Sequence, residues 1–253
     1  MTIILDWQEI FMICLENTPN YAGVYLSGDV HDLSMLHASL LTIIGEEGEY
    51  AGYDQVRHRV LRLCSDLEEA IIGQEEMVFV PNGIGIDRET LSSITLSEVS
   101  ESNVNFRMKV LWPELLFVGF VLNDYVELAA KHKAHYWDPI HANVRQFQSL
   151  IGECLEKTIG WDKFRLIKSY LTPTFIGYYQ NYITQYIDYL NNKFLRMNSE
   201  KRLANISIAA KRIADKGNSY MGIKRKVEAT AIQQGIEWKE VNIVEYFIKE
   251  IKW

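Results

Sequence analysis

Residues 112–122 read WPELLFVGFVL, and this stretch decides the fold. Proline is well tolerated in the first turn of a helix and the helix dipole favours a glutamate there, so Trp112-Pro113-Glu114 predicts a helix start. From Leu115 to Leu122 every residue is apolar, around the whole circumference of that helix. A helix without a polar face has to be covered on every side. We therefore expect a central helix around which the rest of the chain packs.

Strand patterns lie on the amino-terminal side of this helix. Apolar and polar residues alternate from Val104 to Leu111, as they do in a strand with one buried face. Met77 to Val80 predicts another short strand. The apolar runs Ile10 to Cys14 and Val24 to Leu26 flank the turn sequence Asn17-Thr18-Pro19-Asn20. Two strands around such a turn predict a hairpin.

Helices are predicted on both sides of the central one. Before it, Asp32 to Ile44 and Tyr53 to Ile72 carry apolar residues at helical spacing. After it, most of the chain has a helical pattern, with candidate helices at His141 to Thr158, Trp161 to Tyr170, Pro173 to Met197, Ser199 to Lys216 and Ser219 to Gln234. The final stretch, Trp238 to Trp253, fits a strand or a helix.

These elements predict an α+β fold. A small, mainly antiparallel sheet with helices forms the N-terminal half, and an all-helical C-terminal half packs on it. Residues 1–135 form an acidic α+β subdomain that ends in the central hydrophobic helix. Residues 136–253 form a basic helical subdomain. We expect the two subdomains to pack against each other in one compact unit, because each carries apolar helix stripes that have to be buried.

The charge is distributed unevenly between these parts. The whole chain has 26 Lys and Arg against 33 Asp and Glu, a formal net charge of −7. Residues 1 to 130 contribute −15 and residues 131 to 253 contribute +8. Such asymmetry indicates either an anionic partner for the basic half or a contact between the two halves.

Cysteine usage and hydropathy indicate the compartment. The three cysteines, Cys14, Cys64 and Cys154, are widely spaced and include no CxxC pair. This argues against a disulfide framework and against a cysteine zinc site, and it favours a reducing compartment. No apolar run approaches the roughly 18 residues of a membrane span. The sequence therefore predicts a cytoplasmic protein without a membrane partner.

A run of potential metal ligands follows the central helix. His132, His135, Asp138 and His141 are spaced three residues apart. Histidine and aspartate suit zinc and other transition metals, so one hypothesis is a metal-assisted hydrolase. The alternative is a polar helix end and an exposed loop, because Asp138-Pro139 breaks the helix. No cofactor is otherwise indicated.

A basic segment near the carboxyl end suggests a second hypothesis. Its eight basic residues are Lys201, Arg202, Lys211, Arg212, Lys216, Lys224, Arg225 and Lys226. With the apolar stripe buried, these side chains can project outward and contact nucleic-acid phosphates. The alternative is a solvated helix face, or one that pairs with the acidic half. The sequence pI near 5.5 lies well below the value of about 9 typical of nucleic-acid-binding domains.

Two carboxylates on the central helix need partners. Asp124 and Glu127 follow its apolar run, and Lys131 lies four residues beyond Glu127 in the favoured order. A structural ion pair is the main interpretation. A buried acid with a raised pKa, able to act as a general acid, is the alternative.

Two short motifs resemble an uncharacterised family of bacterial proteins. Residues 18–29 follow the pattern TPNxAGVxLSGD, and LWPE occupies residues 111–114. The resemblance covers roughly the first 135 residues. It implies a bacterial cytosolic setting and gives no residue a role.

Together these features favour a non-catalytic interaction protein of the bacterial cytosol, such as a defence-system or immunity-type component. Its acidic surface would meet a protein partner, either a different chain or another copy of this one. Nucleic-acid binding through residues 199–226 and metal-assisted hydrolysis at residues 132–141 are the alternatives. No set of residues predicts a catalytic site.

Overall fold

The apolar run after Trp112 forms helix α4 (Trp112–His132), and every residue from Leu115 to Asp124 is buried. The structure is a computed structural model that describes residues 13–81, 102–132, 135–244 and 250–253. Helices α1, α5, α7 and α8 and the sheet all pack against α4. The prediction of a central helix is therefore confirmed. Within the described residues, no helix is both long and apolar enough to cross a bilayer.

The sheet lies on the amino-terminal side of α4 in sequence. Its strands are β1 (Cys14–Asn17), β2 (Gly23–Gly28), β3 (Glu76–Pro81) and β4 (Ser102–Leu111), in the order β1-β2-β4-β3. All of the pairs are antiparallel. The predicted hairpin is β1–β2, although its first strand starts at Cys14; residues 10–12 lie outside the described part of the chain.

One close contact explains a glycine at the start of β2. A Cβ on Gly23 would lie 1.9 Å from the carbonyl oxygen of Val110 on β4. Only glycine lets the two backbones approach this closely. The Thr18 side chain and main chain hold the other side of the turn through bonds to Gly23.

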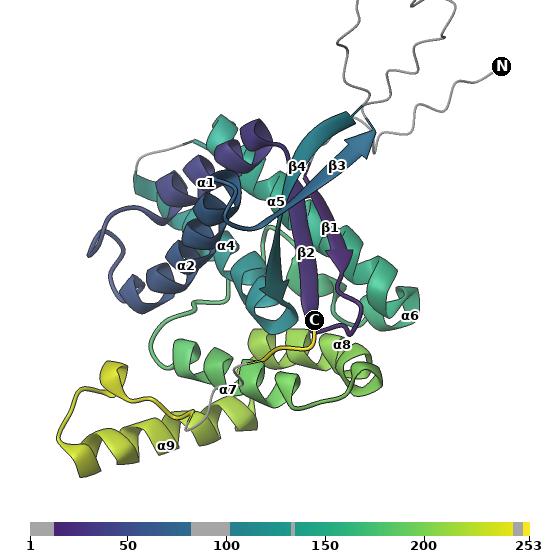
Figure 1. Cartoon of the computed structure of the whole chain (residues 1–253). Coiled ribbons are helices and arrows are strands. Elements are labelled where there is room, and N and C mark those ends of the chain that lie inside the picture. Colours follow the sequence, from purple (N-terminus) through teal and green to yellow (C-terminus); the bar gives the residue numbers. More distant parts are fainter. Residues whose placement is uncertain (1–12, 82–101, 133–134, 245–249) are drawn as a thin grey trace, which may run out of the picture.

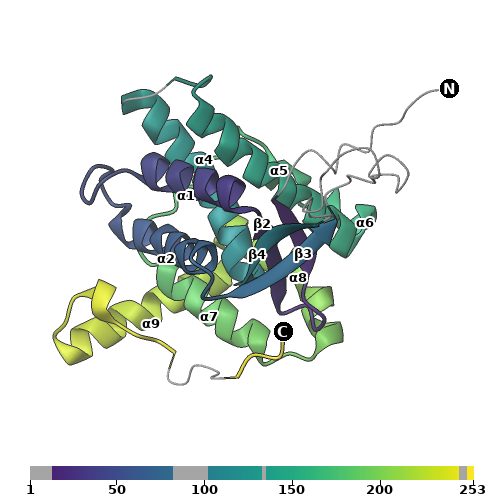
Figure 2. The ribbon, with the colours of Figure 1, turned by 45° about the horizontal axis from the view of Figure 1, so that its top comes forward.

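Helices cover one face of the sheet. Val24 and Leu26 on β2, with Met108 and Val110 on β4, are buried beneath the helices. Helices α1 (Val30–Ile44) and α2 (Asp54–Ile71) lie beside one another on this side, as Figures 1 and 2 show. On the opposite face, the Arg107 guanidinium lies 4.7 Å above the Tyr25 ring.

The carboxyl-terminal half is helical. It contains α5 (Pro139–Ile159), α6 (Trp161–Phe164), the 3-10 helix η2 (Lys168–Leu171), α7 (Ile183–Leu195), α8 (Ser199–Asp215), α9 (Asn218–Gln234) and the 3-10 helix η3 (Trp238–Glu240). One buried apolar cluster includes residues of this half and of the sheet half. The α+β fold class is therefore confirmed. In Figure 1, α9 extends away at the lower left, packed on α7.

Two predicted helices are wrong in part. Residues 172–182 form an irregular segment, and α7 begins only at Ile183. Tyr178 and Asn181 have φ values of 49° and 58°, which no α-helix accommodates. The irregular backbone is held by side chains of α4, described below. The helix predicted over Trp161 to Tyr170 ends at Phe164 and gives way to turns and η2.

Candidate interaction surface

Strand β3 forms the outer edge of the sheet. In the part of the chain that the structure describes, β3 pairs only with β4. In Figure 1, β3 and β4 together reach beyond β1 and β2 toward the upper right. An edge strand presents unpaired N–H and C=O groups, which form a template for another strand. Within the residues that the structure describes, β3 is therefore a strand edge to which another strand could be added.

Apolar side chains cluster on this edge. Phe79 is 73% exposed, Met77 is 57% exposed, and Val104, directly opposite Phe79 on β4, is 39% exposed. We call these three residues the edge strip. They share the sheet face that Met108 and Val110 bury further along β4, but here the strands extend past the covering helices. Contiguous apolar surface of this kind often marks an interaction site.

Acidic residues flank the edge strip. Glu68 and Glu69 near the end of α2, and Glu75 and Glu76 at the start of β3, are all exposed. Among them lies Asp66, whose pKa is raised to about 6 by burial and then by the negative charge of Glu69 and other acids. Arg107 offsets part of this charge at 3.8 Å from both Glu76 and Glu16. This end of the sheet thus combines an apolar strip with a negative border.

The predicted metal ligands are spread along a helix end and a cap. Asp138 caps α5 by accepting from the Ile140 N–H at 2.9 Å, and His135 is exposed. The His132 ring lies 5.9 Å from that of Tyr50. His141 is buried, and burial lowers its pKa. Throughout the described ranges, no three His, Cys, Asp or Glu side chains are placed to hold a metal ion.

Only some of the eight basic residues predicted to bind nucleic acid are exposed. Lys201, Lys211, Arg225 and Lys226 are exposed, on α8 and α9. Arg212 and Lys224 are half-buried, and Lys224 lies 3.9 Å from Glu228.

Arg202 and Lys216 correct this prediction, because both bind main-chain oxygens inside the protein. Buried Arg202 donates to the carbonyls of Leu195 and Lys252 at 2.9 and 2.6 Å. Lys216 donates to the Gly177 carbonyl at 2.6 Å. The sequence shows that both side chains are charged but not where they point. Both were expected to project outward like the neighbouring basic side chains.

The side chain of Asp124 is buried, and both of its carboxylate oxygens accept hydrogen bonds. Its carboxylate accepts from the main-chain N–H groups of Gly177 and Tyr179 and from the Tyr53 hydroxyl, each at 2.8 Å. Burial raises its pKa, and these three donors oppose that effect. The predicted ion pair between Glu127 and Lys131 is confirmed at 3.0 Å. Asp124 itself is a structural acceptor that holds the irregular segment 172–182 against α4.

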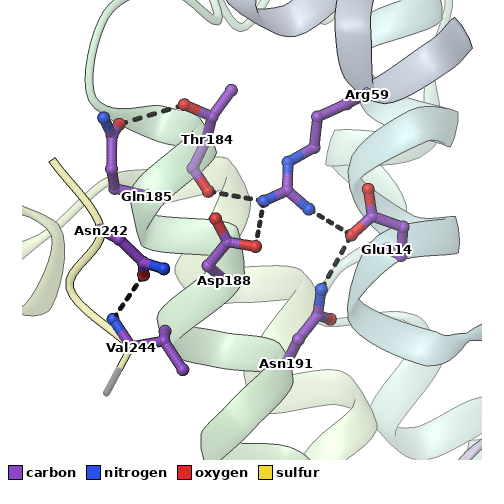
Figure 3. Close-up of polar contacts among 8 residues, drawn as sticks. All are labelled: Arg59, Glu114, Thr184, Gln185, Asp188, Asn191, Asn242 and Val244. Atoms are coloured by element: carbon purple, nitrogen blue, oxygen red, sulfur yellow. Dashed lines mark hydrogen bonds and ion pairs between the residues drawn. The ribbon is translucent and has the colours of Figure 1, made fainter. Parts of the chain in front are cut away.

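A buried ion cluster joins the two halves (Figure 3). Arg59 of α2 donates to Glu114 at the start of α4 at 2.6 Å, and to Asp188 and the Thr184 carbonyl of α7. Asn191 also donates to Glu114, at 2.8 Å. Although burial alone would lower the pKa of Arg59, the two carboxylates keep it raised. The charged groups pair with one another, so the arrangement is a structural connection between distant elements.

A family model described as "Domain of unknown function (DUF6904)" matches residues 13–253. The chain belongs to this family. The resemblance to an uncharacterised family is thus confirmed, and the match extends over nearly the whole chain rather than its first part. No curated protein and no solved structure matches the chain.

The sequence did not single out the edge strip. Met77 to Val80 was predicted as a strand, but its place in the sheet depends on pairing with β4. A signal was available in the charge pattern, because Glu75 and Glu76 precede an apolar run that Pro81 ends. Charged residues and proline at the ends of a strand are common at sheet edges.

Proposed function

We propose that this protein is a non-catalytic interaction component, which binds a protein partner by adding a strand of that partner to β3. The observation that carries the proposal is the exposed edge strip beside the edge of β3 that pairs with no other strand among the described residues. Main-chain hydrogen bonds along an edge supply affinity in this binding mode, and alternate side chains supply specificity. Phe79 and Met77 would provide the apolar anchors.

Charge favours a partner of a different kind over a second copy. Glu68, Glu69, Glu75 and Glu76 border the edge strip, and the chain as a whole is negative. A second copy would bring the same acids to the interface, and like charges there are costly. An extended segment with apolar residues at alternate positions and lysine or arginine beside them complements the surface. Its attraction would speed association and weaken with salt.

The proposed setting is the bacterial cytosol. Cys14, Cys64 and Cys154 are free thiols, and a reducing compartment keeps exposed thiols such as that of Cys14 unoxidised. Membership of a defence or immunity system stays a prediction of the sequence. Nucleic-acid binding through the exposed bases of α8 and α9 also stays a prediction.

The test compares partner capture by matched surface variants. The tagged full chain is used to recover binding proteins from its native cells, and the recovered partner is then purified and titrated against it. Phe79→Lys and Met77→Lys should each weaken binding by about tenfold or more, because they remove exposed anchors of the kind that dominate interfaces. Both residues are exposed, so the variants should melt like the wild type.

Ile232→Lys on α9 is the control, since Ile232 is 83% exposed and far along the chain from β3. It should bind the partner as the wild type does. Equal binding by the Phe79 and Ile232 variants would rule out β3 as the contact. A purified chain that forms a stable dimer, lost in Phe79→Lys, would instead identify the partner as a second copy.

A further inference from the structure

A groove lies on the side of the molecule formed by α4, α5 and the segment from Phe164 to Pro173. Its volume is about 540 Å³, within the range of small-molecule sites. Its walls are largely apolar and include Leu116, Phe120, Ile151, Phe164 and Leu171. The side chain of Arg145 on α5 also lines it. We call this cavity the Arg145 groove.

Arg145 is held by neutral groups. Its Nη1 donates to the Asn123 side-chain oxygen and, at 2.7 Å, to Gln148 Oε1. Gln148 in turn donates to Asn123 Oδ1 at 3.0 Å and to the Gly119 carbonyl at 2.7 Å. Asn123 donates to the carbonyls of Thr172 and Phe175, at 3.0 and 2.9 Å. The network therefore fixes both the guanidinium and the loop that walls the groove.

The rest of the guanidinium has no such partner. Within the described ranges, no carboxylate forms an ion pair with Arg145, and neither Nε nor Nη2 makes a hydrogen bond. These two nitrogens lie on one edge of the guanidinium and match the two oxygens of a carboxylate. Burial lowers the pKa of Arg145, and the smaller opposing effect of Tyr136 does not cancel this shift. An anion entering the groove would stabilise a half-buried cation of this kind.

Gly152 supplies an independent observation. It lies inside α5, where glycine costs about 1 kcal/mol relative to alanine. Its φ is not positive, and a Cβ added there would meet no described atom within 4 Å. Neither backbone geometry nor close packing requires glycine at this position. Because Gly152 lines the groove, its missing side chain leaves space for a ligand.

We propose that the Arg145 groove binds a small monocarboxylate with an apolar chain or ring. The carboxylate bonds to Nε and Nη2 of Arg145, and the apolar body lies against the walls from α4 and α5. Glu153, Glu156 and Lys168 also line the groove. The net charge of these three side chains is negative and repels a dianion more than a monoanion, which favours a carboxylate over a phosphate monoester. The site is distinct from the β3 edge, so either proposal can fail without the other.

The test is a calorimetric titration of the full chain with octanoate, 1-octanol and octyl phosphate. Octanoate should bind saturably and at least about tenfold more tightly than either of the other two compounds. Arg145→Gln should weaken octanoate binding by about tenfold or more. Gly152→Leu should abolish it by filling the groove, with a melting temperature equal to or above that of the wild type because leucine favours helix.

Arg165→Gln is the matched control. Arg165 is exposed, lies close in sequence to the groove wall, and pairs only weakly with Asp162 at 3.8 Å. Its removal takes away the same charge without changing the groove and should leave octanoate binding unchanged. The absence of saturable octanoate binding, or unchanged binding by Gly152→Leu, would overturn the proposal. Octyl phosphate binding more tightly than octanoate would overturn the assignment to a monocarboxylate.

Discussion

The pKa of Asp66 is raised by its burial and by the acidic residues near the edge strip. Asp66 lies near the end of α2, partly buried, with Glu69 and Glu75 close enough to raise its pKa further. The folded state therefore holds its proton up to about pH 6, whereas the ordinary aspartate pKa is 3.8. Between these values the folded form binds more protons than the unfolded form. The free energy of unfolding accordingly falls as pH rises through this window and stays lower above it.

Asp66→Asn should remove this penalty, because asparagine has the same shape and no charge. The variant should be more stable than the wild type by about 1 kcal/mol at pH 7.5, a figure reduced for the partial exposure of the side chain. The difference should shrink toward pH 4, where the wild-type carboxyl is protonated in both states. Urea denaturation of both proteins from pH 4 to 8 measures it. A difference that does not change with pH would contradict the assignment.

At the scale of elements, segment 172–182 shows tertiary contacts overriding local preference. Thr172-Pro173 has the composition of a helix start, yet α7 begins ten residues later. The N–H groups of Gly177 and Tyr179 bond to Asp124, and the carbonyls of Thr172 and Phe175 accept from Asn123. These bonds replace those that a helix would have made. A Cβ on Gly177 would also lie 2.1 Å from the Tyr179 ring.

Asp124→Asn should destabilise this segment. The new amide group would face at least one N–H donor that now has a carboxylate oxygen, so the free energy of unfolding should fall by about 2 kcal/mol. Hydrogen exchange should become faster at the amides of Gly177 and Tyr179. The control is Glu127→Gln on the same helix, which breaks an exposed ion pair and should cost less than about 1 kcal/mol. Unchanged protection at both amides would show that Asp124 does not hold the segment.

At the scale of the whole molecule, the Arg59 cluster couples the acidic and basic halves. Arg59 and Glu114 come from the acidic N-terminal half, and Asp188 comes from the basic C-terminal half. Arg59 finds its carboxylates on two other helices, Glu114 on α4 and Asp188 on α7. Removing one member of a buried ion cluster leaves an uncompensated charge.

Arg59→Met should therefore lower the free energy of unfolding by about 3 kcal/mol. Adding Glu114→Gln should recover part of this loss, because it removes the carboxylate left without its cation. Chemical denaturation of the wild type, both single variants and the double variant forms a cycle that isolates the coupling. Purely additive losses in the double variant would mean that the two residues act independently.

The sequence by itself determined the elements whose identity depends on local periodicity. The uniformly apolar run from Leu115 and the helical stripes of α1 and α2 each predict a burial pattern that the structure has. The alternation from Val104 predicts the strand β4, and its apolar face is buried at Met108 and Val110 but exposed at Val104. The ends of α1, α2, α8 and α9 were predicted within a few residues, whereas the start predicted at Thr172-Pro173 was wrong. These features follow from neighbours three or four residues away in a helix and two in a strand, which are always visible in the chain.

The tertiary structure alone decided where polar groups find partners and which surfaces stay open. Asp124 meets Gly177 across 53 residues, and Arg59 meets Asp188 across 129. Arg202, expected at the surface, is buried because distant carbonyls surround it. The edge position of β3 and the Arg145 groove likewise depend on which elements pack together. A side chain's charge is a property of the residue, whereas its burial and its partners are properties of the assembled fold.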